Sequence, residues 1–233
     1  MAAPFYVSPE QQTQDKAEFA RKGIARGKPI VALDYEHGIV MIAENRSGSL
    51  RKLGEIYDRI GFAGVGKFDE YENLRKQGVK YADVRGYSYS RDDVAASNLA
   101  TEYSQLLGQV FSQPYTKPLE VELLICEVGD QASQYFQVLF DGSVRDRQNF
   151  ATIGGDADKL EGVLRQNWKA GLGLGEAVAL GRKALTQASN GSGKLDHESL
   201  EIVLLDRRRE GRKFRRLRPV DIQALEEFGE LRT

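Results

Sequence analysis

The fold of this chain is decided by the segment Ile30-Val31-Ala32-Leu33-Asp34-Tyr35, then Glu36-His37-Gly38, then Ile39-Val40-Met41-Ile42-Ala43-Glu44. Apolar and β-branched residues fill both runs, and a short turn that ends in glycine separates them, which predicts the two strands of a hairpin. Because the strands are apolar nearly throughout, both of their faces should be covered by other layers. The hairpin is therefore expected inside a layered structure.

Helical and strand patterns come in groups around this hairpin. Ser8 can cap a helix that begins at Pro9 and runs to about Arg26. After the hairpin we expect an extended segment over 56–65, helices over 68–77 and 92–111, strands over 120–128, 135–140 and 150–153, helices over 156–169 and 174–188, strands over 199–205 and 213–217, and a helix over 220–228. Clustered strands favour antiparallel sheets, and paired helices favour helical layers outside them. We predict an α+β fold, a four-layer αββα sandwich with an extra N-terminal helix.

Length and composition agree with one globular unit. The chain has 233 residues, 41% of them hydrophobic, and a net charge of -1. No linker divides it, so we expect a single domain with a leading segment (1–8), a helix (9–26), a sandwich (27–228) and a tail (229–233). One cysteine and two histidines exclude a disulfide framework, a cysteine-based zinc site and a histidine-rich metal site, and we expect no cofactor. The start lacks the features of a leader, and no apolar run approaches the ~20 residues that span a bilayer. We expect a cytoplasmic protein without membrane contact.

Two glycine-rich stretches resemble nucleotide-binding motifs without completing them. The first, Gly61 to Phe68, nearly matches the phosphate loop, but Phe68 stands where that loop needs a hydroxyl for Mg²⁺. We interpret it as a strand-to-helix junction. The second, Gly171 to Gly175, follows a predicted helix, whereas a dinucleotide fingerprint follows a strand. We interpret it as a turn between two helices.

A basic cluster lies near the C-terminus, where eight of the twelve residues from Arg207 to Arg218 are Lys or Arg. Such a cluster can bind the phosphates of a nucleic acid. It can equally be a solvated hairpin turn, with Phe214 and Leu217 facing the core. The near-zero net charge and the lack of interleaved aromatic residues favour the hairpin, and we expect no nucleic-acid partner.

The residues show no catalytic constellation. His37 falls in a tight turn and His197 in a polar loop, and Cys126 lies in an apolar strand, where a buried, inert thiol is expected. A hydrolase that uses its own terminal amine needs Thr, Ser or Cys as its first residue after processing. The chain has no Gly-Thr junction, and its three Gly-Ser pairs lie in loops or turns rather than directly before the first strand.

Several stretches together resemble the α-type subunits of the 20S proteasome, specifically the actinobacterial kind. They are Tyr6 to Glu10, Ala20 to Gly27, Glu55 to Ala63 with Gly66-Lys67, Tyr81 to Tyr87, Pro118 to Glu122 and Tyr135 to Gly142. The resemblance runs from about residue 5 to 228. It implies the sandwich fold, a place in a seven-membered outer ring, and no catalytic role, since the β-type subunits of that family carry the N-terminal threonine.

The resemblance also implies two sites. In such proteins the segment before the first helix lies over the axial pore as a gate, which here comprises Phe5, Tyr6, Val7, Ser8 and Pro9. A lysine receives the terminal carboxylate of an ATPase tail, and the matching position is Lys52, with Gly66 and Lys67 beside the pocket. From the residues alone, Lys52 is a surface lysine.

The implied partners are copies of the chain itself, a β-type subunit, and a ring-shaped ATPase or another activator. Unfolded polypeptides would pass through, including those tagged with a small ubiquitin-like modifier. One alternative is a self-processing amidohydrolase of the same architecture, because fold does not fix function. A nucleic-acid-binding protein that uses the basic cluster is a third interpretation.

Overall fold

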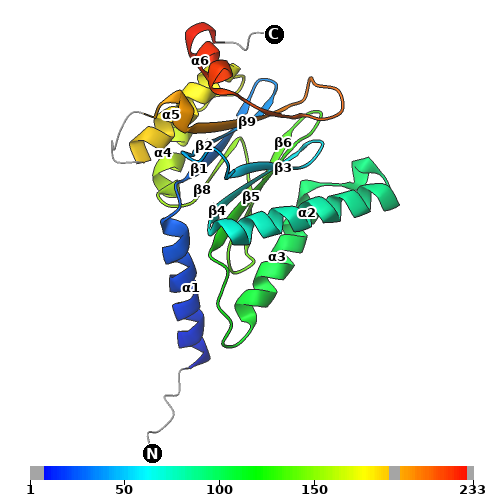
Figure 1. The fold of residues 1–233 in the computed structure, drawn as a ribbon, viewed down its shortest axis with the longest axis vertical. Helices are drawn as coiled ribbons and strands as arrows, with labels where there is room; N and C mark the ends of the chain where they lie inside the picture. The colour runs from blue at the N-terminus through cyan, green and yellow to red at the C-terminus, as the bar shows by residue number, and fades with distance from the viewer. Residues whose placement is uncertain (1–7, 189–194, 230–233) are drawn as a thin grey trace, which may run out of the picture.

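A computed structural model describes residues 8–188 and 195–229 of the chain, and there two five-stranded sheets lie between layers of helices (Figure 1). The strand order is β10-β9-β2-β1-β8 in the first sheet and β3-β4-β5-β6-β7 in the second, with antiparallel pairing throughout. The elements are, in chain order, α1 (Pro9–Ala25), β1 (Ile30–Tyr35), β2 (Gly38–Glu44), β3 (Leu53–Tyr57), β4 (Ile60–Gly66), α2 (Phe68–Ser88), η1 (Arg91–Asp93), α3 (Ala96–Ser112), β5 (Val121–Val128), β6 (Ser133–Val138), β7 (Val144–Arg147), β8 (Phe150–Ile153), α4 (Ala157–Asn167), α5 (Leu174–Ala188), η2 (His197–Ser199), β9 (Leu200–Asp206), β10 (Phe214–Arg216) and α6 (Pro219–Phe228).

Three apolar clusters hold four layers together. The central cluster joins the inner faces of the two sheets and includes Met41 and Leu205 from one and Cys126 and Tyr135 from the other. A second cluster packs α4, α5 and α6 onto the outer face of the first sheet. A third packs α2 and α3 onto the outer face of the second sheet. The predicted α+β sandwich with four layers is therefore confirmed.

Helix α1 stands at one end of the sandwich, and its first turns point away from the sheets (Figure 1). Ser8 caps it as predicted, since its hydroxyl accepts a 3.2 Å hydrogen bond from the Gln11 amide, and Pro9 occupies the first helical position. Ala20 and Ile24 are buried in the central cluster. The second half of the helix is thus part of the core that the two sheets share.

One element predicted from the sequence is wrong. The single extended segment over 56–65 is two strands, β3 and β4, which pair around a turn at Asp58 and Arg59. Arg59 fixes this turn from a distance, because its Nε donates a 2.6 Å hydrogen bond to Glu127 and its Nη2 one of 3.3 Å to the Val94 carbonyl. The structure also adds β7 and extends α2 to Ser88, eleven residues beyond its predicted end at Gln77.

Candidate functional site

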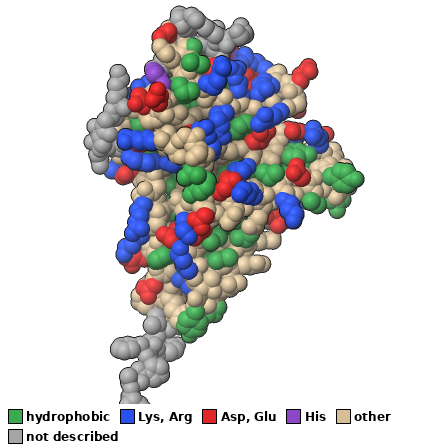
Figure 2. Space-filling model, in the orientation of Figure 1, with side chains coloured by type: hydrophobic (Ala, Val, Ile, Leu, Met, Phe, Trp, Pro, Cys, Tyr) green, Lys and Arg blue, Asp and Glu red, His purple; other side chains and the backbone are tan. Residues whose placement is uncertain are grey.

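Lys52 lies directly before β3, at the edge of a cavity of about 870 Å³. The cavity is bounded by α2, by β3 and by the hairpin that joins β9 to β10. Buried aromatic side chains contribute to its wall, while charged side chains of both signs line it; they include Phe62, Tyr71, Phe214, Glu55, Glu72, Arg75 and Arg212. Figure 2 likewise shows basic and acidic side chains interspersed on the surface rather than one patch of a single sign.

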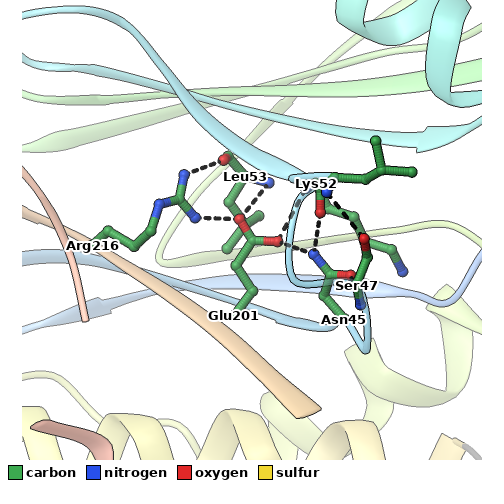
Figure 3. Close-up of polar contacts among 7 residues, drawn as sticks. Asn45, Ser47, Lys52, Leu53, Glu201 and Arg216 are labelled. Atoms are coloured by element: carbon green, nitrogen blue, oxygen red, sulfur yellow. Dashed lines mark hydrogen bonds and ion pairs between the residues drawn. The ribbon is translucent and has the colours of Figure 1, made fainter. Parts of the chain in front are cut away.

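The main chain of Lys52 is fixed on both sides. Its N–H donates a 3.0 Å hydrogen bond to the Glu201 carboxylate, and its carbonyl accepts one of 3.2 Å from the Gly64 amide. The carboxylate of Glu201 is buried and lies at the centre of a hydrogen-bond network (Figure 3). It also accepts hydrogen bonds from Asn45, Leu53 and Arg216. The network holds the turn before β3 against β9 and β10. It thereby fixes the backbone position from which the Lys52 side chain extends.

The ammonium group of Lys52 is half-buried and has only part of its hydrogen-bonding capacity used. Its Nζ donates a 2.8 Å hydrogen bond to the carbonyl oxygen of Glu44, the last residue of β2. Burial lowers the pKa of Lys52, an effect opposed by the carboxylates of Glu44 and Glu201 and reinforced by the charge of Lys28. A poorly hydrated ammonium of this kind favours an anionic ligand. A carboxylate is a suitable one, because charge-assisted hydrogen bonds to ammonium groups are short and strong.

Gly66 ends β4 at a position that only glycine suits. Its φ is +110°, and a Cβ there would overlap the carbonyl oxygen of Glu120. The same carbonyl accepts a 2.9 Å hydrogen bond from the Lys67 amide, so the strand-to-helix junction predicted for this stretch is held tightly. Gly66 follows Gly64, the partner of Lys52, by two residues along β4, which places it near that lysine in the sheet.

Lys67 is directed elsewhere. Its side chain is exposed, and its Nζ lies 3.3 Å from Asp69 and 3.5 Å from Glu70 in the first turn of α2. The hydrogen bond to Asp69 raises the pKa of Lys67. Neither Gly66 nor Lys67 lines the cavity that Lys52 lines. Of the three residues predicted for the activator pocket, Lys52 alone combines a charge with a place at the cavity.

The predicted gate is described only in part. Phe5, Tyr6 and Val7 lie outside the described residues. Ser8 and Pro9 form the capped start of α1. The point at which the segment leaves the helix is therefore defined by the structure.

The cationic side chains of the basic cluster make contacts within the chain. Phe214 and Leu217 are buried, as the hairpin interpretation requires. Each of the eight cations has an intramolecular partner: Arg207 the Gly129 carbonyl, Arg208 Asp206, Arg209 the Phe214 carbonyl, Arg212 Glu55, Lys213 the Arg207 carbonyl, Arg215 and Arg218 Asp221, and Arg216 Glu201. These contacts support a structural hairpin.

The remaining motifs take the structures predicted for them. The stretch from Gly171 to Gly175 comprises the end of the connection between α4 and α5 and the first two residues of α5. Cys126 is fully buried, which raises the pKa of its thiol well above the ordinary value. Within residues 8–188 and 195–229, no cluster of His, Cys, Asp and Glu is arranged to hold a metal ion. In the same residues no helix has the length and apolar character needed to cross a membrane.

Sequence reasoning missed three charged residues of the site, namely Lys28, Glu44 and Glu201. Both glutamates stand within or at the end of strands that are otherwise apolar, and both are buried. A charged residue inside such a run is a signal of a buried ionic contact, because an isolated charge is costly to bury. That signal identifies the residue but not its partner.

Comparison with known proteins gives a consistent result. The family model described as "Proteasome subunit" matches residues 24–204. The chain is 50% identical over 225 residues to the "Proteasome subunit alpha" of Kineococcus radiotolerans, which covers 93% of this chain and 94% of that protein. It is 48% identical over 233 residues to the protein of that name from Streptomyces coelicolor, with 98% and 92% covered. For Pseudarthrobacter chlorophenolicus the identity is 48% over 235 residues, with 97% and 99% covered.

Proposed function

Because this chain belongs to the proteasome subunit family and is an α-type subunit of the core particle, we propose that it acts there as a non-catalytic component that controls access. In this proposal seven copies form the outer ring, one face of the ring contacts β-type subunits, and the other face receives an activator. The β-type subunits supply the threonine nucleophile, and this chain supplies none.

The observation that carries the proposal is the position of α1. An amine-terminal nucleophile would have to stand at the start of the first strand, but here a helix precedes β1 and buries Ala20 and Ile24 in the core between the sheets. Removing the helix to expose a new terminus would uncover this apolar surface, and burial of a side chain as large as that of Ile24 stabilises a fold by about 1.5–3 kcal/mol. The junction itself reads Gly27-Lys28-Pro29, without Ser, Thr or Cys.

The proposed gate is the segment that precedes α1. Phe5, Tyr6 and Val7 would close the axial pore by apolar packing, while Ser8 and Pro9 set the direction in which the segment leaves the helix. The capped start of α1 supports this proposal, because a fixed helix end defines where the segment begins. Segments with few buried contacts open at low free-energy cost, as a gate requires.

The proposed activator site is built around Lys52. Its half-buried ammonium would receive the terminal carboxylate of an ATPase tail, at the edge of a cavity large enough for several side chains. Gly66 would shape the site, and Lys67 would add a more distant positive charge. Unfolded proteins, including those that carry a ubiquitin-like tag, would be the substrates in transit, and the assembly would be cytoplasmic.

The test uses a core reconstituted from this chain and its β-type subunit. Deleting residues 1–7 keeps the Ser8 cap of α1, so any effect belongs to the segment rather than to the helix. We expect faster hydrolysis of a fluorogenic peptide without activator and an unchanged particle size. Hydrolysis at the wild-type rate would contradict the gate, and amide hydrolysis by the purified chain alone would contradict the non-catalytic role.

A further inference from the structure

Two cationic side chains contact one buried carboxylate next to the cavity, and a third contacts the carbonyl oxygen of the same residue. Glu44 is only 6% exposed, and its Oε2 lies 3.4 Å from Lys28 Nζ while its Oε1 lies 3.6 Å from Arg46 Nε. Its carbonyl oxygen accepts the hydrogen bond from Lys52. The other carboxylate close to Lys52 belongs to Glu201, which is paired with Arg216. The group formed by Lys28, Glu44, Arg46 and Lys52 therefore carries an excess of positive charge.

Of the two cations that contact the Glu44 carboxylate, the Arg46 side chain is the more exposed, at 76%, but the charge that acts on Lys52 is that of Lys28. The Lys28 side chain is 51% exposed, whereas that of Glu44 is 7% exposed, so the ammonium group is open to solvent on the side away from Glu44. The distance of 3.4 Å is longer than the ~2.7–2.9 Å of a well-formed charge-assisted hydrogen bond. Pro29 follows Lys28 and restricts its backbone to extended conformations, which limits where the side chain can reach.

Lys28 and Lys52 both contact Glu44, the first through its carboxylate and the second through its carbonyl oxygen. The positive charge of Lys28 is one of the causes that lower the pKa of Lys52. Two like charges near one carboxylate repel each other, and a second anion between them relieves this repulsion. A divalent cation would be disfavoured at the same place.

We propose that Lys28 is a second carboxylate-binding residue of the activator site, so that the ammonium groups of Lys28 and Lys52 hold the terminal carboxylate of the tail together. This inference rests on the proposed function, because it presumes that a tail carboxylate comes to Lys52. A carboxylate has two oxygens, and each can accept from a different ammonium group. Lys28 does not line the cavity, so the carboxylate is bound at its edge, beside Glu44, with the preceding residues of the tail towards the cavity.

The experiment measures binding to the reconstituted core of a fluorescent peptide that comprises the last eight residues of the ATPase. The peptide is used with a free terminal carboxylate and with a terminal amide. The variants are Lys28→Met, Lys28→Arg and Lys52→Met. The control is Lys159→Met, since Lys159 has a similarly exposed side chain on α4 and also pairs with an acidic residue, Asp156.

We expect Lys28→Met to weaken binding of the free-carboxylate peptide about tenfold, as loss of one hydrogen bond to a charged group predicts. Binding of the amidated peptide should not change in that variant. Lys28→Arg should restore most of the affinity, and Lys159→Met should bind as the wild type does.

Two outcomes would overturn the inference alone. Wild-type affinity of Lys28→Met for the free-carboxylate peptide, with Lys52→Met still impaired, would show that Lys52 acts without it. An equal loss for both peptides would show that Lys28 only maintains the fold. If neither amidation nor Lys52→Met affects binding, the proposed activator site itself is wrong. If Lys28→Met assembles poorly, the affinities of Lys28→Gln and Lys28→Arg for the free-carboxylate peptide are compared instead. A weaker affinity of Lys28→Gln supports the inference, and equal affinities contradict it.

Discussion

The hydroxyl of Tyr135 in β6 donates a 2.8 Å hydrogen bond to the carboxylate of Asp34 in β1, and so joins the two sheets through a polar contact inside the sandwich. Tyr135 is fully buried. Burial raises the pKa of Asp34, although the bond from Tyr135 and the charge of Arg207 act in the opposite direction. A carboxyl group of this kind makes the stability of the fold depend on pH.

The free energy of unfolding of the Asp34→Asn variant should therefore increase relative to that of the wild type as the pH rises. The folded-state pKa of Asp34 lies above its unfolded-state value, so the contribution of the neutral carboxyl is complete below the unfolded pKa, about 3.9. It is lost as the pH rises through the higher folded pKa. Urea unfolding of both proteins across this range measures the difference, with the exposed Asp130→Asn as control. A difference that stays constant with pH would contradict the prediction.

Gly66→Ala should destabilise the fold by at least about 2 kcal/mol, because the new Cβ overlaps the Glu120 carbonyl and the residue must keep a left-handed φ. Gly162→Ala is a suitable control, since that glycine lies inside α4 with nothing near the added Cβ. There the change should stabilise by up to about 1 kcal/mol. The midpoints of thermal unfolding compare the two, and similar shifts would contradict the assignment of strain to Gly66.

Glu201→Gln should cost about 1–3 kcal/mol, since it weakens the charge-assisted bond to Arg216 and the bonds that hold the Lys52 and Leu53 amides. The free energy of unfolding in urea measures the loss. Glu198→Gln, at an exposed position three residues earlier, should change it by less than about 0.5 kcal/mol. If both variants lose the same amount, the network around Lys52 has no special stabilising role.

Lys67→Met should weaken binding of the free-carboxylate ATPase peptide less than twofold, while Lys52→Met weakens it about tenfold or more. The reason is that Lys67 is exposed and already paired with Asp69 and Glu70, and exposed ion pairs contribute little. Fluorescence anisotropy with the reconstituted core gives both affinities. A larger effect at Lys67 than at Lys52 would move the site to the start of α2.

Ser8→Ala should loosen the first turn of α1 at a cost of about 1 kcal/mol, because the Gln11 amide loses its hydroxyl acceptor. Hydrogen exchange at the amides of Gln11 and Gln12 should accelerate, while Ser8→Asp should keep the cap and the protection. Equal exchange rates in all three proteins would show that the turn is held by other contacts.

The layers and most elements could be predicted from the sequence, because the strands are apolar and the helices periodic. The turn at Asp58 and Arg59 could not, since it contains no glycine or proline and is fixed by Glu127 and Val94, which are distant along the chain. Strand β7 is short and mostly exposed, so it has no apolar signal of its own. Helix α2 continues past Gln77 through Gly78, which packs closely against Tyr103, a contact that periodicity cannot show.

The candidate site was predicted through resemblance, and its environment became visible only in three dimensions. Nothing near Lys52 in the chain indicates that its ammonium group meets the Glu44 carbonyl or that Glu201 holds its amide. Lys28 shows the same limit, because the sequence places it only after a helix and before a proline. The predicted hairpin of β1 and β2 brings Lys28 towards Glu44, whereas Glu201 comes from β9, whose pairing with β2 could not be derived from the sequence.

The connection between α1 and β1 has a mechanical consequence. Gly27 packs so closely against Val65 and Gly66 that a Cβ would not fit, and Lys28 lies next to it. With 17 residues and a rise of ~1.5 Å each, the helix beyond this pivot is about 26 Å long. A rotation of about 5° there would swing Ser8 by roughly 2 Å over that length. It requires that the bonds from Lys16 to the end of α3 break and that the buried side chains of Ala20 and Ile24 repack. If the proposed carboxylate site and the proposed gate are correct, the helix would connect them mechanically, with Gly27 at one end and Ser8 at the other.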